Sequence, residues 1–337
     1  MEISRTTRHR AVRIAFFNHK GGVGKTLLTA NLACILADLG KQVLLVDSDP
    51  QCNLTSFFIE DSVVDKLLDS SDKSNGQTLW TALKPLVEAE GDAHIVETIE
   101  RRENLRIIPG DIRLAEYEAE LHTFWSECLQ RKLRGFRATT ALGAVVNELS
   151  RNHKIDYVLY DCGPNIGPLN RIILLDADFF IVPAACDLFS SRAIRTLGKA
   201  LSSWISEWEI ISKLAPQDVQ LLPGRPRLMG YVPQRYRVYG RAPTHSHAHY
   251  ISKIERAVGT DLATVLKKIH PSLVPFTRHR VGEVRDFGTL ASTAQTLGLP
   301  IFDLPSATPT QLSDARATFE ALAREIILRS RQKGSSK

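Results

Sequence analysis

Short apolar runs alternate along this chain with longer stretches whose apolar residues recur every three or four positions. Runs of five to seven largely apolar residues are typical of buried parallel strands, and they occur at 12–17, 42–47, 105–109, 155–161, 179–183 and 228–232. The helical period predicts helices near 26–39, 113–121, 137–151, 168–175, 190–211, 250–268 and 310–329. A short strand is predicted at 300–303. Because strands alternate with helices, we expect an α/β fold with a doubly wound, mostly parallel sheet flanked by helices.

The same pattern predicts one domain with insertions. Residues 12–330 are expected to form that domain, and the less regular stretches at about 59–104 and 206–284 are expected to be insertions. Residues 1–11 are polar and basic, and we expect a flexible leader that is too short for a helix-turn-helix. Residues 331–337 are expected to form a basic tail.

A glycine-rich loop, HKGGVGKT, joins the first predicted strand to the first predicted helix. Backbone N–H groups of such a loop surround phosphate oxygens, and the helix dipole adds attraction. In this setting Lys25 can reach the β- and γ-phosphates of ATP, and the Thr26 hydroxyl can bind Mg²⁺. A chance glycine-rich turn is the alternative. The predicted nucleotide-binding residues of the loop are Gly21, Gly22, Val23, Gly24, Lys25, Thr26 and Leu27.

Three aspartates end predicted strands, where ligands bind in open α/β sheets. Asp47 and Asp49 follow the second strand, and Asp161 ends the strand at 155–161. Asp161 fits a Walker B aspartate that holds Mg²⁺ partly through water. For Asp47 and Asp49 a turn or a helix N-cap is the alternative.

Composition limits the remaining function classes. The 337 residues carry a net charge of +6, so an anionic partner is plausible but not established by charge alone. Five cysteines, an odd number without a C-x-x-C pair, favour reduced thiols in a cytoplasmic protein. No run approaches ~18 apolar residues, so we expect no membrane-spanning segment.

Several motifs resemble the ParA/MinD family of deviant Walker A ATPases, most closely the ParA/Soj type. The loop KGGVGKT resembles that family's phosphate loop, VDSDPQCNLTS its D-x-D-P-Q-x-N segment, and DCGPNIG its D-C-P-P-S-x-G segment. Gly163 stands where the last of these usually has proline. The resemblance covers 12–58, 105–205 and 285–328.

This resemblance implies roles for individual residues. Lys20 takes the place of the signature lysine, which contacts the phosphates in the other subunit of an ATP-bound dimer. Asp49 would orient the attacking water, Asp47 would support Mg²⁺ through water, and the backbone near Pro305 would border the adenine. A solvent-exposed loop lysine is the alternative for Lys20.

The resemblance also implies an ATP-dependent homodimer that hydrolyses ATP slowly, answers to an activating partner protein and takes part in DNA partition or positioning. The alternative is an ATPase regulatory subunit of a larger assembly, such as a defence or secretion complex. A third class, an electron-transfer ATPase of the nitrogenase-iron-protein type, needs cysteines that bridge a cluster. Cys128 and Cys162 are too isolated for that class.

Two further features concern partners. Five arginines are candidates for contacts with non-specific DNA or a partner protein, although a solvated face is as good an interpretation: Arg235, Arg237, Arg241, Arg278 and Arg280. His245, His247 and His249 would share one face of a strand, as metal ligands can, or would lie in a polar loop. The basic C-terminal stretch lacks an apolar stripe, so we expect no membrane anchoring.

Overall fold

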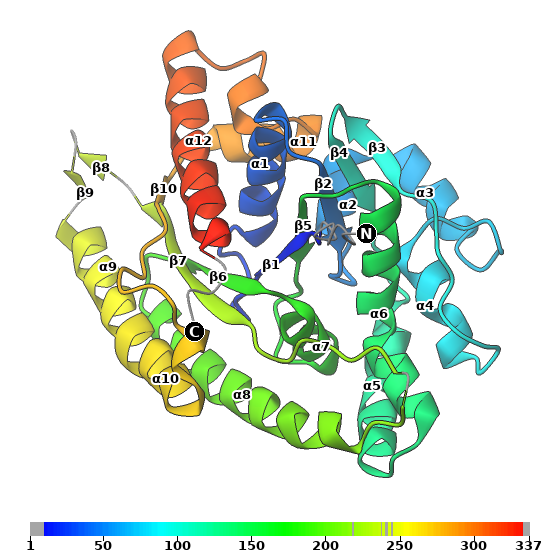
Figure 1. Cartoon of the computed structure of the whole chain (residues 1–337). Coiled ribbons are helices and arrows are strands. Elements are labelled where there is room, and N and C mark those ends of the chain that lie inside the picture. Colours follow the sequence, from blue (N-terminus) through cyan, green and yellow to red (C-terminus); the bar gives the residue numbers. More distant parts are fainter. Residues whose placement is uncertain (1–9, 218, 237, 240–241, 244, 333–337) are drawn as a thin grey trace, which may run out of the picture.

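One eight-stranded sheet runs through the middle of the molecule in the computed structural model (Figure 1). The structure describes residues 10–217, 219–236, 238–239, 242–243 and 245–332. In sheet order the strands are β10 (Val284–Arg285), β7 (Arg227–Tyr236), β6 (Phe179–Ala185), β1 (Val12–Phe16), β5 (Tyr157–Asp161), β2 (Val43–Asp47), β4 (Leu105–Ile108) and β3 (Ile99–Arg102). A separate ladder pairs β8 (Val238–Tyr239) with β9 (Ala242–Pro243).

The strand pairing confirms the predicted doubly wound, mostly parallel sheet. All neighbours in the sheet pair in parallel except β3 and β4, which are antiparallel. Strand β1 lies between β5 and β6, with Ile14 opposite both Leu159 and Phe179. The carboxyl ends of the parallel strands therefore meet at one edge of the sheet.

Helices cover both faces of the sheet (Figure 1). One face packs against α4 (Leu79–Val87), α5 (Leu114–Leu129), α6 (Leu133–Asn152), α7 (Pro168–Asp176), α8 (Ser190–Ile211), α9 (His245–Ala257) and α10 (Thr264–Ile269). The other face packs against α1 (Lys25–Asp38), α2 (Asn53–Phe58), α3 (Asp61–Asp69), α11 (Thr289–Leu297) and α12 (Pro309–Arg331). Short turns of other helix types are η1 (Ser212–Leu214), η2 (Val258–Ala263), η3 (Pro271–Leu273) and η4 (Ile301–Asp303).

The apolar runs of the sequence explain these two layers of helices. Successive side chains of a strand point to opposite faces of the sheet. In and just after β1, Ala15 and Phe17 belong to one core while Ile14 and Phe16 belong to the other. A strand that is apolar throughout therefore needs helices on both sides.

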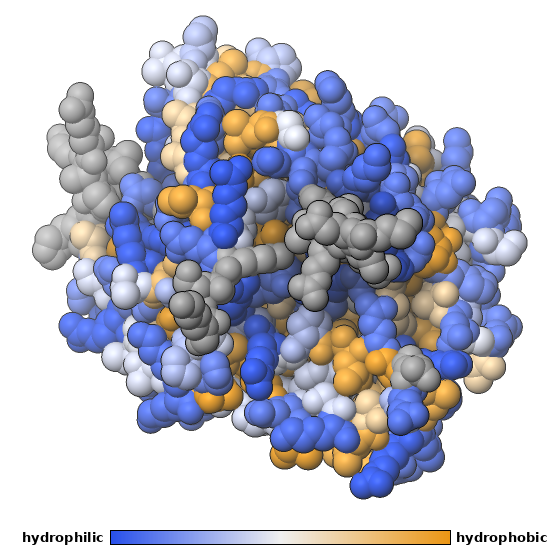
Figure 2. Space-filling model, in the orientation of Figure 1, coloured by the Kyte–Doolittle hydropathy of each residue, from blue (hydrophilic) through white to orange (hydrophobic). Residues whose placement is uncertain are grey.

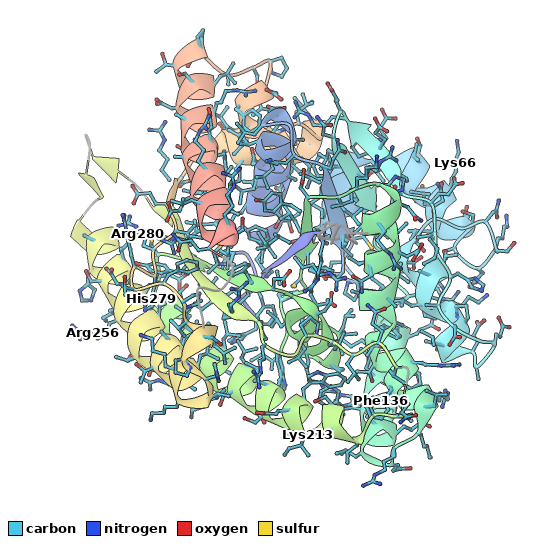
Figure 3. The ribbon with its side chains drawn as sticks, in the orientation of Figure 1. Lys66, Phe136, Lys213, Arg256, His279 and Arg280 are labelled. Carbon is cyan, nitrogen blue, oxygen red and sulfur yellow. The ribbon has the colours of Figure 1, made fainter. Side chains whose placement is uncertain are left out.

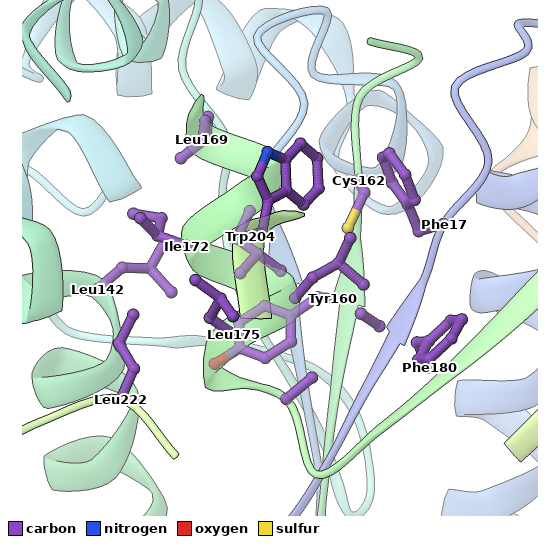
Figure 4. Close-up of a cluster of buried hydrophobic side chains, with 14 of the residues drawn as sticks. Phe17, Leu142, Tyr160, Cys162, Leu169, Ile172, Leu175, Phe180, Trp204 and Leu222 are labelled. Carbon is purple, nitrogen blue, oxygen red and sulfur yellow. The ribbon is translucent and has the colours of Figure 1, made fainter. Parts of the chain in front are cut away.

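The core on the α6–α7–α8 side contains a polar pair as well as apolar side chains. Tyr160 of β5 lies among Leu142, Ile172 and Trp204 (Figure 4). Its hydroxyl donates to Asp176 Oδ2 at 2.6 Å, and Asp176 also forms an ion pair with a buried arginine of β1. The Tyr160 hydroxyl, both Asp176 oxygens and the two terminal guanidinium nitrogens of Arg13 thus have partners, while Arg13 Nε has none among the described residues.

The segment at 59–104, predicted to be an insertion, adds side chains to the main cores. It forms α3, α4 and β3, and β3 extends the sheet by one antiparallel strand. Leu79, Trp80 and Leu83 of α4 are fully buried in the core that also contains α5 and α6. Apolar residues recur at helical spacing only over short pieces of this segment, so the sequence does not predict that α4 is buried.

Two predicted elements differ in the structure. The strand predicted at 300–303 is the 3₁₀ helix η4, and the sheet edge is formed by β10 instead. The Ile301 N–H donates to Asn31 Oδ1 at 2.8 Å, so this segment is held by α1 and does not join a sheet ladder. The helix predicted at 250–268 begins earlier, at His245, and contains the π-helical turn η2.

In the part of the chain that the structure describes, no helix is long and apolar enough to cross a membrane. On the face shown in Figure 2, hydrophilic residues dominate and apolar residues form separate small areas.

Candidate functional site

A cavity of about 700 Å³ lies at the carboxyl edge of the sheet. The loop between β1 and α1 forms one wall, and segments that follow β2, β5, β7 and β10 form the others. Its lining residues are Gly21, Gly22, Val23, Gly24, Lys25, Thr26, Leu27, Asp49, Gln51, Asn53, Pro164, Gln234, Val284, Arg285, Asp286, Phe287, Gly288, Thr289, Ala291, Ser292 and Gln295. The whole predicted phosphate loop therefore faces one cavity.

Two glycines give this loop its turn. Gly22 and Gly24 have φ angles of 69° and 86°, in the left-handed region that favours glycine. Gly24 is the N-cap of α1, and the first turn of α1 has no acidic residue. The positive end of the α1 dipole therefore points toward the cavity, and no acidic side chain in the first turn neutralises it. This arrangement favours the binding of an anion.

Lys25 is the buried cation of the cavity, with only 7% of its surface exposed. Its ammonium group donates to the backbone carbonyl of Asn18 at 3.0 Å and lies 3.5 Å from that of Lys20. Burial lowers the pKa of Lys25, while the nearby Asp161 and Asp49 act in the opposite direction. A phosphate group is a stronger hydrogen-bond acceptor than a backbone carbonyl, so a bound phosphate can take over these contacts.

Thr26 and Asp161 form a pair that fits a bound Mg²⁺. The Thr26 hydroxyl donates to Asp161 Oδ2 at 2.7 Å. Burial raises the pKa of Asp161 to about 8. Its other oxygen, Oδ1, is buried without a hydrogen-bond partner among the described residues. Hydroxyl and carboxylate oxygens are what Mg²⁺ prefers, and a divalent cation would satisfy the orphaned oxygen.

Asp47 lies beside this pair but turns away from the cavity, which it does not line. Its Oδ2 accepts from the Thr55 N–H at 2.8 Å and from the Thr55 hydroxyl at 2.6 Å. Burial raises the pKa of Asp47 to about 6. Its Oδ1 accepts from the Asp49 N–H at 3.3 Å, so Asp47 holds both the turn after β2 and Thr55 of α2. Support of Mg²⁺ through water stays a prediction for this residue.

Asp49 does face the cavity. Its Oδ1 accepts from the Gln51 N–H at 3.0 Å, which fixes the carboxylate within the turn before α2. A Cβ built on Gly163 would lie 3.3 Å from the same oxygen, so the β5–α7 loop packs directly against this carboxylate. Burial raises the pKa of Asp49 and the charge of Lys25 lowers it. A side chain at position 163 would crowd this contact.

Lys20 forms an ion pair within its own chain, which the sequence did not predict. Its ammonium group pairs with Asp187 Oδ2. Asp187 Oδ1 accepts from the Phe189 and Ser190 N–H groups at 3.0 and 3.1 Å, at the start of α8. Although partial burial raises the pKa of Asp187, its contact with Lys20 lowers it overall. An acid two residues past a buried strand is the available sequence signal.

Part of the cavity wall comes from residues that the sequence analysis did not single out. Pro305 is exposed and does not line the cavity. The wall opposite the phosphate loop comes from Gln234 of β7 and from residues 284–295. Gln234 is buried against the loop, since a Cβ built on Gly24 would lie 2.6 Å from its Oε1. Its position at the carboxyl end of a buried strand was the only signal for it in the sequence.

The predicted basic contacts are only partly described. The side chain of Arg235, and all of Arg237 and Arg241, lie outside the described residues. Arg278 is exposed, and Arg280 forms an ion pair with Glu283.

The basic surface continues beyond these arginines. Figure 3 shows Arg256, His279 and Arg280 on the same side of the molecule, and Lys66 on the opposite side. Further exposed cations on α9 and α10 are Lys253, Arg256, Lys267 and Lys268.

The histidine trio does not lie on a strand, because His245 begins α9. The side chains of His245 and His247 are outside the described residues, and the His249 ring packs edge-on against Tyr250. Within the described ranges, no group of three or more histidines, cysteines or acids could hold a metal ion. All five cysteines are buried and free, including Cys128 and Cys162.

Comparison with known proteins agrees with this geometry. The family model described as "AAA domain" matches residues 11–214. The chain is 33% identical over 192 residues to the sporulation initiation inhibitor protein Soj of Bacillus subtilis, covering 55% of this chain and 62% of Soj. It is 31% identical to the chromosome partitioning protein ParA of Caulobacter vibrioides, covering 56% of this chain and 61% of that protein. The matched region thus spans about three fifths of the length of these relatives.

Solved structures share the fold. The structure of pNOB8 ParA superposes with a TM-score of 0.66 at 20% identity, covering 96% of this chain and 100% of that one. A second structure, of pNOB8 ParA bound to nonspecific DNA, has a TM-score of 0.58 at 18% identity, covering the same shares of the two chains.

Proposed function

The chain belongs to the AAA domain family of ParA/MinD-type partition ATPases, and from that premise we propose that it is an ATP-driven switch for DNA partition or positioning. It binds ATP and Mg²⁺, dimerises in that state and returns to the monomer after slow hydrolysis to ADP and phosphate. The observation that carries this proposal is the pair of lysines on one phosphate loop, Lys25 buried in the cavity and Lys20 at its rim. We propose that it works in the cytoplasm with an activating partner protein.

The cavity supplies what phosphoryl transfer needs. Backbone N–H groups of the loop and Lys25 bind the phosphates, and Thr26 with Asp161 holds Mg²⁺, which neutralises charge on the β- and γ-phosphates. We propose that Asp49 orients the attacking water, because its carboxylate lines the same cavity as the phosphate loop and is held there between Gln51 and the β5–α7 loop. Asp49 contributes by placing the water correctly, because in phosphoryl transfer the protein takes part in little covalent chemistry.

A second copy of the chain fits the carboxyl edge of the sheet. Exposed apolar side chains follow three of the parallel strands at that edge: Ile112 after β4, Ile166 after β5, and Leu188 and Phe189 after β6. Phe189 is 60% exposed and Ile112 is 60% exposed, which is costly for large apolar groups in water. Their position around the nucleotide cavity supports a dimer in which ATP lies near the interface.

Lys20 links nucleotide state to dimerisation by exchanging partners. In the single chain its charge is matched by Asp187. In the dimer its ammonium group would leave this carboxylate for the phosphates of the partner, a cation in trans that stabilises the charge of the transition state. Because ATP binds better in that state, it shifts the population toward the dimer.

We expect Lys20→Ala to bind ATP with affinity within about threefold of wild type but to lose hydrolysis and ATP-dependent dimerisation. The lysine lies outside the turn that holds the phosphates in its own chain, so binding needs only Lys25 and the backbone. Light scattering with ATP and a phosphate-release assay measure both effects. The matched variant Asp187→Asn keeps an N-cap acceptor for α8 but removes the competing charge, so it should dimerise at lower ATP concentration. Normal turnover by Lys20→Ala would make Lys20 an ordinary surface lysine.

The proposed DNA contacts use the basic side of the molecule that carries Arg278, Arg280 and the cations of α9 and α10. A protein of the same fold, pNOB8 ParA, has been solved on nonspecific DNA. Two copies of this surface in an ATP-bound dimer double the positive charge that one DNA molecule meets. Binding should therefore depend on ATP, ignore sequence and weaken steeply with salt as counterions are released.

For the double variant Arg278→Ala/Arg280→Ala we expect about fivefold to tenfold weaker DNA binding and a salt slope smaller by about one to two. ATP-driven dimerisation should remain. A gel-shift series in ATP at several salt concentrations measures both. The control is Lys66→Ala, an exposed cation on the opposite side of the molecule (Figure 3), which should bind DNA as wild type does. If the ATP-bound dimer has no affinity for DNA even at roughly 50 mM salt, partition fails and the assembly-subunit function takes its place.

A further inference from the structure

The loop that joins β5 to α7, residues 163–167, touches the nucleotide cavity at one end. Pro164 lines the cavity, and a Cβ built on Gly21 of the phosphate loop would lie 3.9 Å from its Cβ. At the neighbouring position, Gly163 packs against Asp49, with a Cβ built there 3.3 Å from Asp49 Oδ1. The position of Asp49 is therefore set partly by this loop.

The other end of the loop meets Glu118, a half-buried residue of α5 that lies outside the cavity. A Cβ built on Gly167 would overlap Glu118 Oε1, so the carboxylate lies directly on the backbone of the loop. The Leu169 N–H and the Asn165 side chain donate hydrogen bonds to it. These groups stand at the start of α7, where the helix dipole favours a negative charge.

The loop is tied together between these two ends. Asn170, which is 2% exposed, donates from its Nδ2 to the Gly163 carbonyl at 3.1 Å and to the Asn165 carbonyl at 2.9 Å. Asn165 Oδ1 in turn accepts from the Gly167 N–H at 2.9 Å. A displacement at the Glu118 end is thus passed through hydrogen bonds to the residue that contacts Asp49.

The pKa of Glu118 depends on its burial, on its hydrogen bonds and on the charge of Asp49. Burial raises its pKa, the two hydrogen bonds lower it, and the charge of Asp49 raises it further. His122, one turn further along α5, acts in the opposite direction. A buried carboxylate that faces another acid persists only where its hydrogen bonds compensate, so this geometry is held by specific contacts.

We propose that Glu118 is a positioning residue for ATP hydrolysis, which fixes the 163–167 loop and through it the carboxylate of Asp49. This inference rests on the proposed ATPase function and adds a residue from a different helix, outside the cavity. Glu118 is not among the residues that line the cavity. It acts by holding the loop in the arrangement in which Asp49 orients the attacking water.

The first test is Glu118→Gln, which keeps the size of the side chain and removes its charge. We expect kcat for ATP to fall about tenfold, because charge-assisted hydrogen bonds are about twice as strong as neutral ones and small misplacements of a reacting group are costly. The KM for ATP and the Kd for ADP should stay within about twofold of wild type. The control is Glu116→Gln on the same helix, whose carboxylate pairs with Arg113 at the surface and should leave kcat unchanged.

A second variant reaches the same contact from the loop. Gly167 has φ −98° and ψ 170°, a conformation that alanine adopts freely. In Gly167→Ala the new methyl group must push away the Glu118 carboxylate and also crowds Asn165 Oδ1, 2.7 Å from the built Cβ, while α5 itself is unaltered. We expect the same loss in kcat, and the double variant should lose little more than either single one, because both act through one contact.

The outcomes separate this inference from the function on which it rests. If the wild-type chain hydrolyses ATP and Glu118→Gln has the same kcat, this inference is overturned while the proposed function stands. A fall in kcat that is matched by lost ADP affinity and a lower Tm makes Glu118 a folding residue and also overturns it. Additive losses in the double variant argue against a shared contact. A wild-type chain that does not hydrolyse ATP overturns the proposed function, and this inference with it.

Discussion

Replacing Lys25 with alanine is expected to lower ATP affinity by about 100-fold or more. Hydrogen bonds to charged groups contribute about 1.5–3 kcal/mol each, and Lys25 is the buried ammonium group beside the predicted phosphate positions. Two such bonds correspond to at least two decades of affinity, since each decade is about 1.4 kcal/mol. Equilibrium titration with a fluorescent ATP analogue measures the change.

Lys25→Ala also removes one positive charge from the protein, so a second lysine variant serves as its control. Lys41 follows the far end of α1, and a helix of 14 residues at about 1.5 Å per residue separates it from the cavity by roughly 20 Å. Lys41→Ala should therefore bind ATP as wild type does. An affinity of Lys25→Ala within about threefold of wild type would refute the assignment of the phosphate loop.

Replacing Asp49 with alanine is expected to lower kcat by about 100-fold or more while ATP affinity stays within about threefold. The phosphate contacts come from the loop and Lys25, and the Mg²⁺ contacts from Thr26 and Asp161, so binding does not need this carboxylate. Hydrolysis does need it, because loss of a group that orients and activates the attacking water typically costs 10²–10⁴-fold. The ATP-bound dimer should accumulate, which size-exclusion chromatography with light scattering measures directly.

The variant Asp49→Asn distinguishes charge from shape. It keeps an acceptor for the Gln51 N–H and the contact with Gly163, but it cannot act as a base or hold the water with a full negative charge. We expect a loss of kcat similar to that of Asp49→Ala. Hydrolysis at the wild-type rate in both variants would place the water-orienting group elsewhere in the cavity.

Local patterns made the fold and the phosphate loop predictable. Five strands, β1, β2, β4, β5 and β6, agree with the predicted ones within about two residues at either end, because each is a largely apolar run between polar residues. The helix predicted at 190–211 has those bounds in the structure. The phosphate loop is a contiguous motif whose glycines, lysine and threonine act through the turn that they form themselves.

Prediction from local pattern failed where contacts with distant segments decide the conformation. Residues 300–303 have the composition of a strand, but the Ile301 N–H is taken by Asn31, 270 positions earlier in the chain. For Asp47 the structure adds that its Oδ2 accepts from Thr55 and its Oδ1 from the Asp49 N–H. At 301 the side chain of a distant helix took the hydrogen bond that a sheet ladder would have used.

The sequence by itself determined the α/β class, the parallel core strands, and the identity and place of the loop that surrounds the cavity, because these follow from neighbouring residues. Only the tertiary structure decided which side chains meet across the sheet edge. Lys20 pairs with Asp187, 167 positions away, because β1 and β6 are neighbours in the sheet and end at the same edge. Gln234 packs on Gly24 from β7, which is separated from β1 by β6 but ends at that edge too. Glu118 reaches Gly167 because α5 packs beside α7. Hydrophobic periodicity specifies that such helices and strands are buried, but the partner that each polar group finds depends on how they pack.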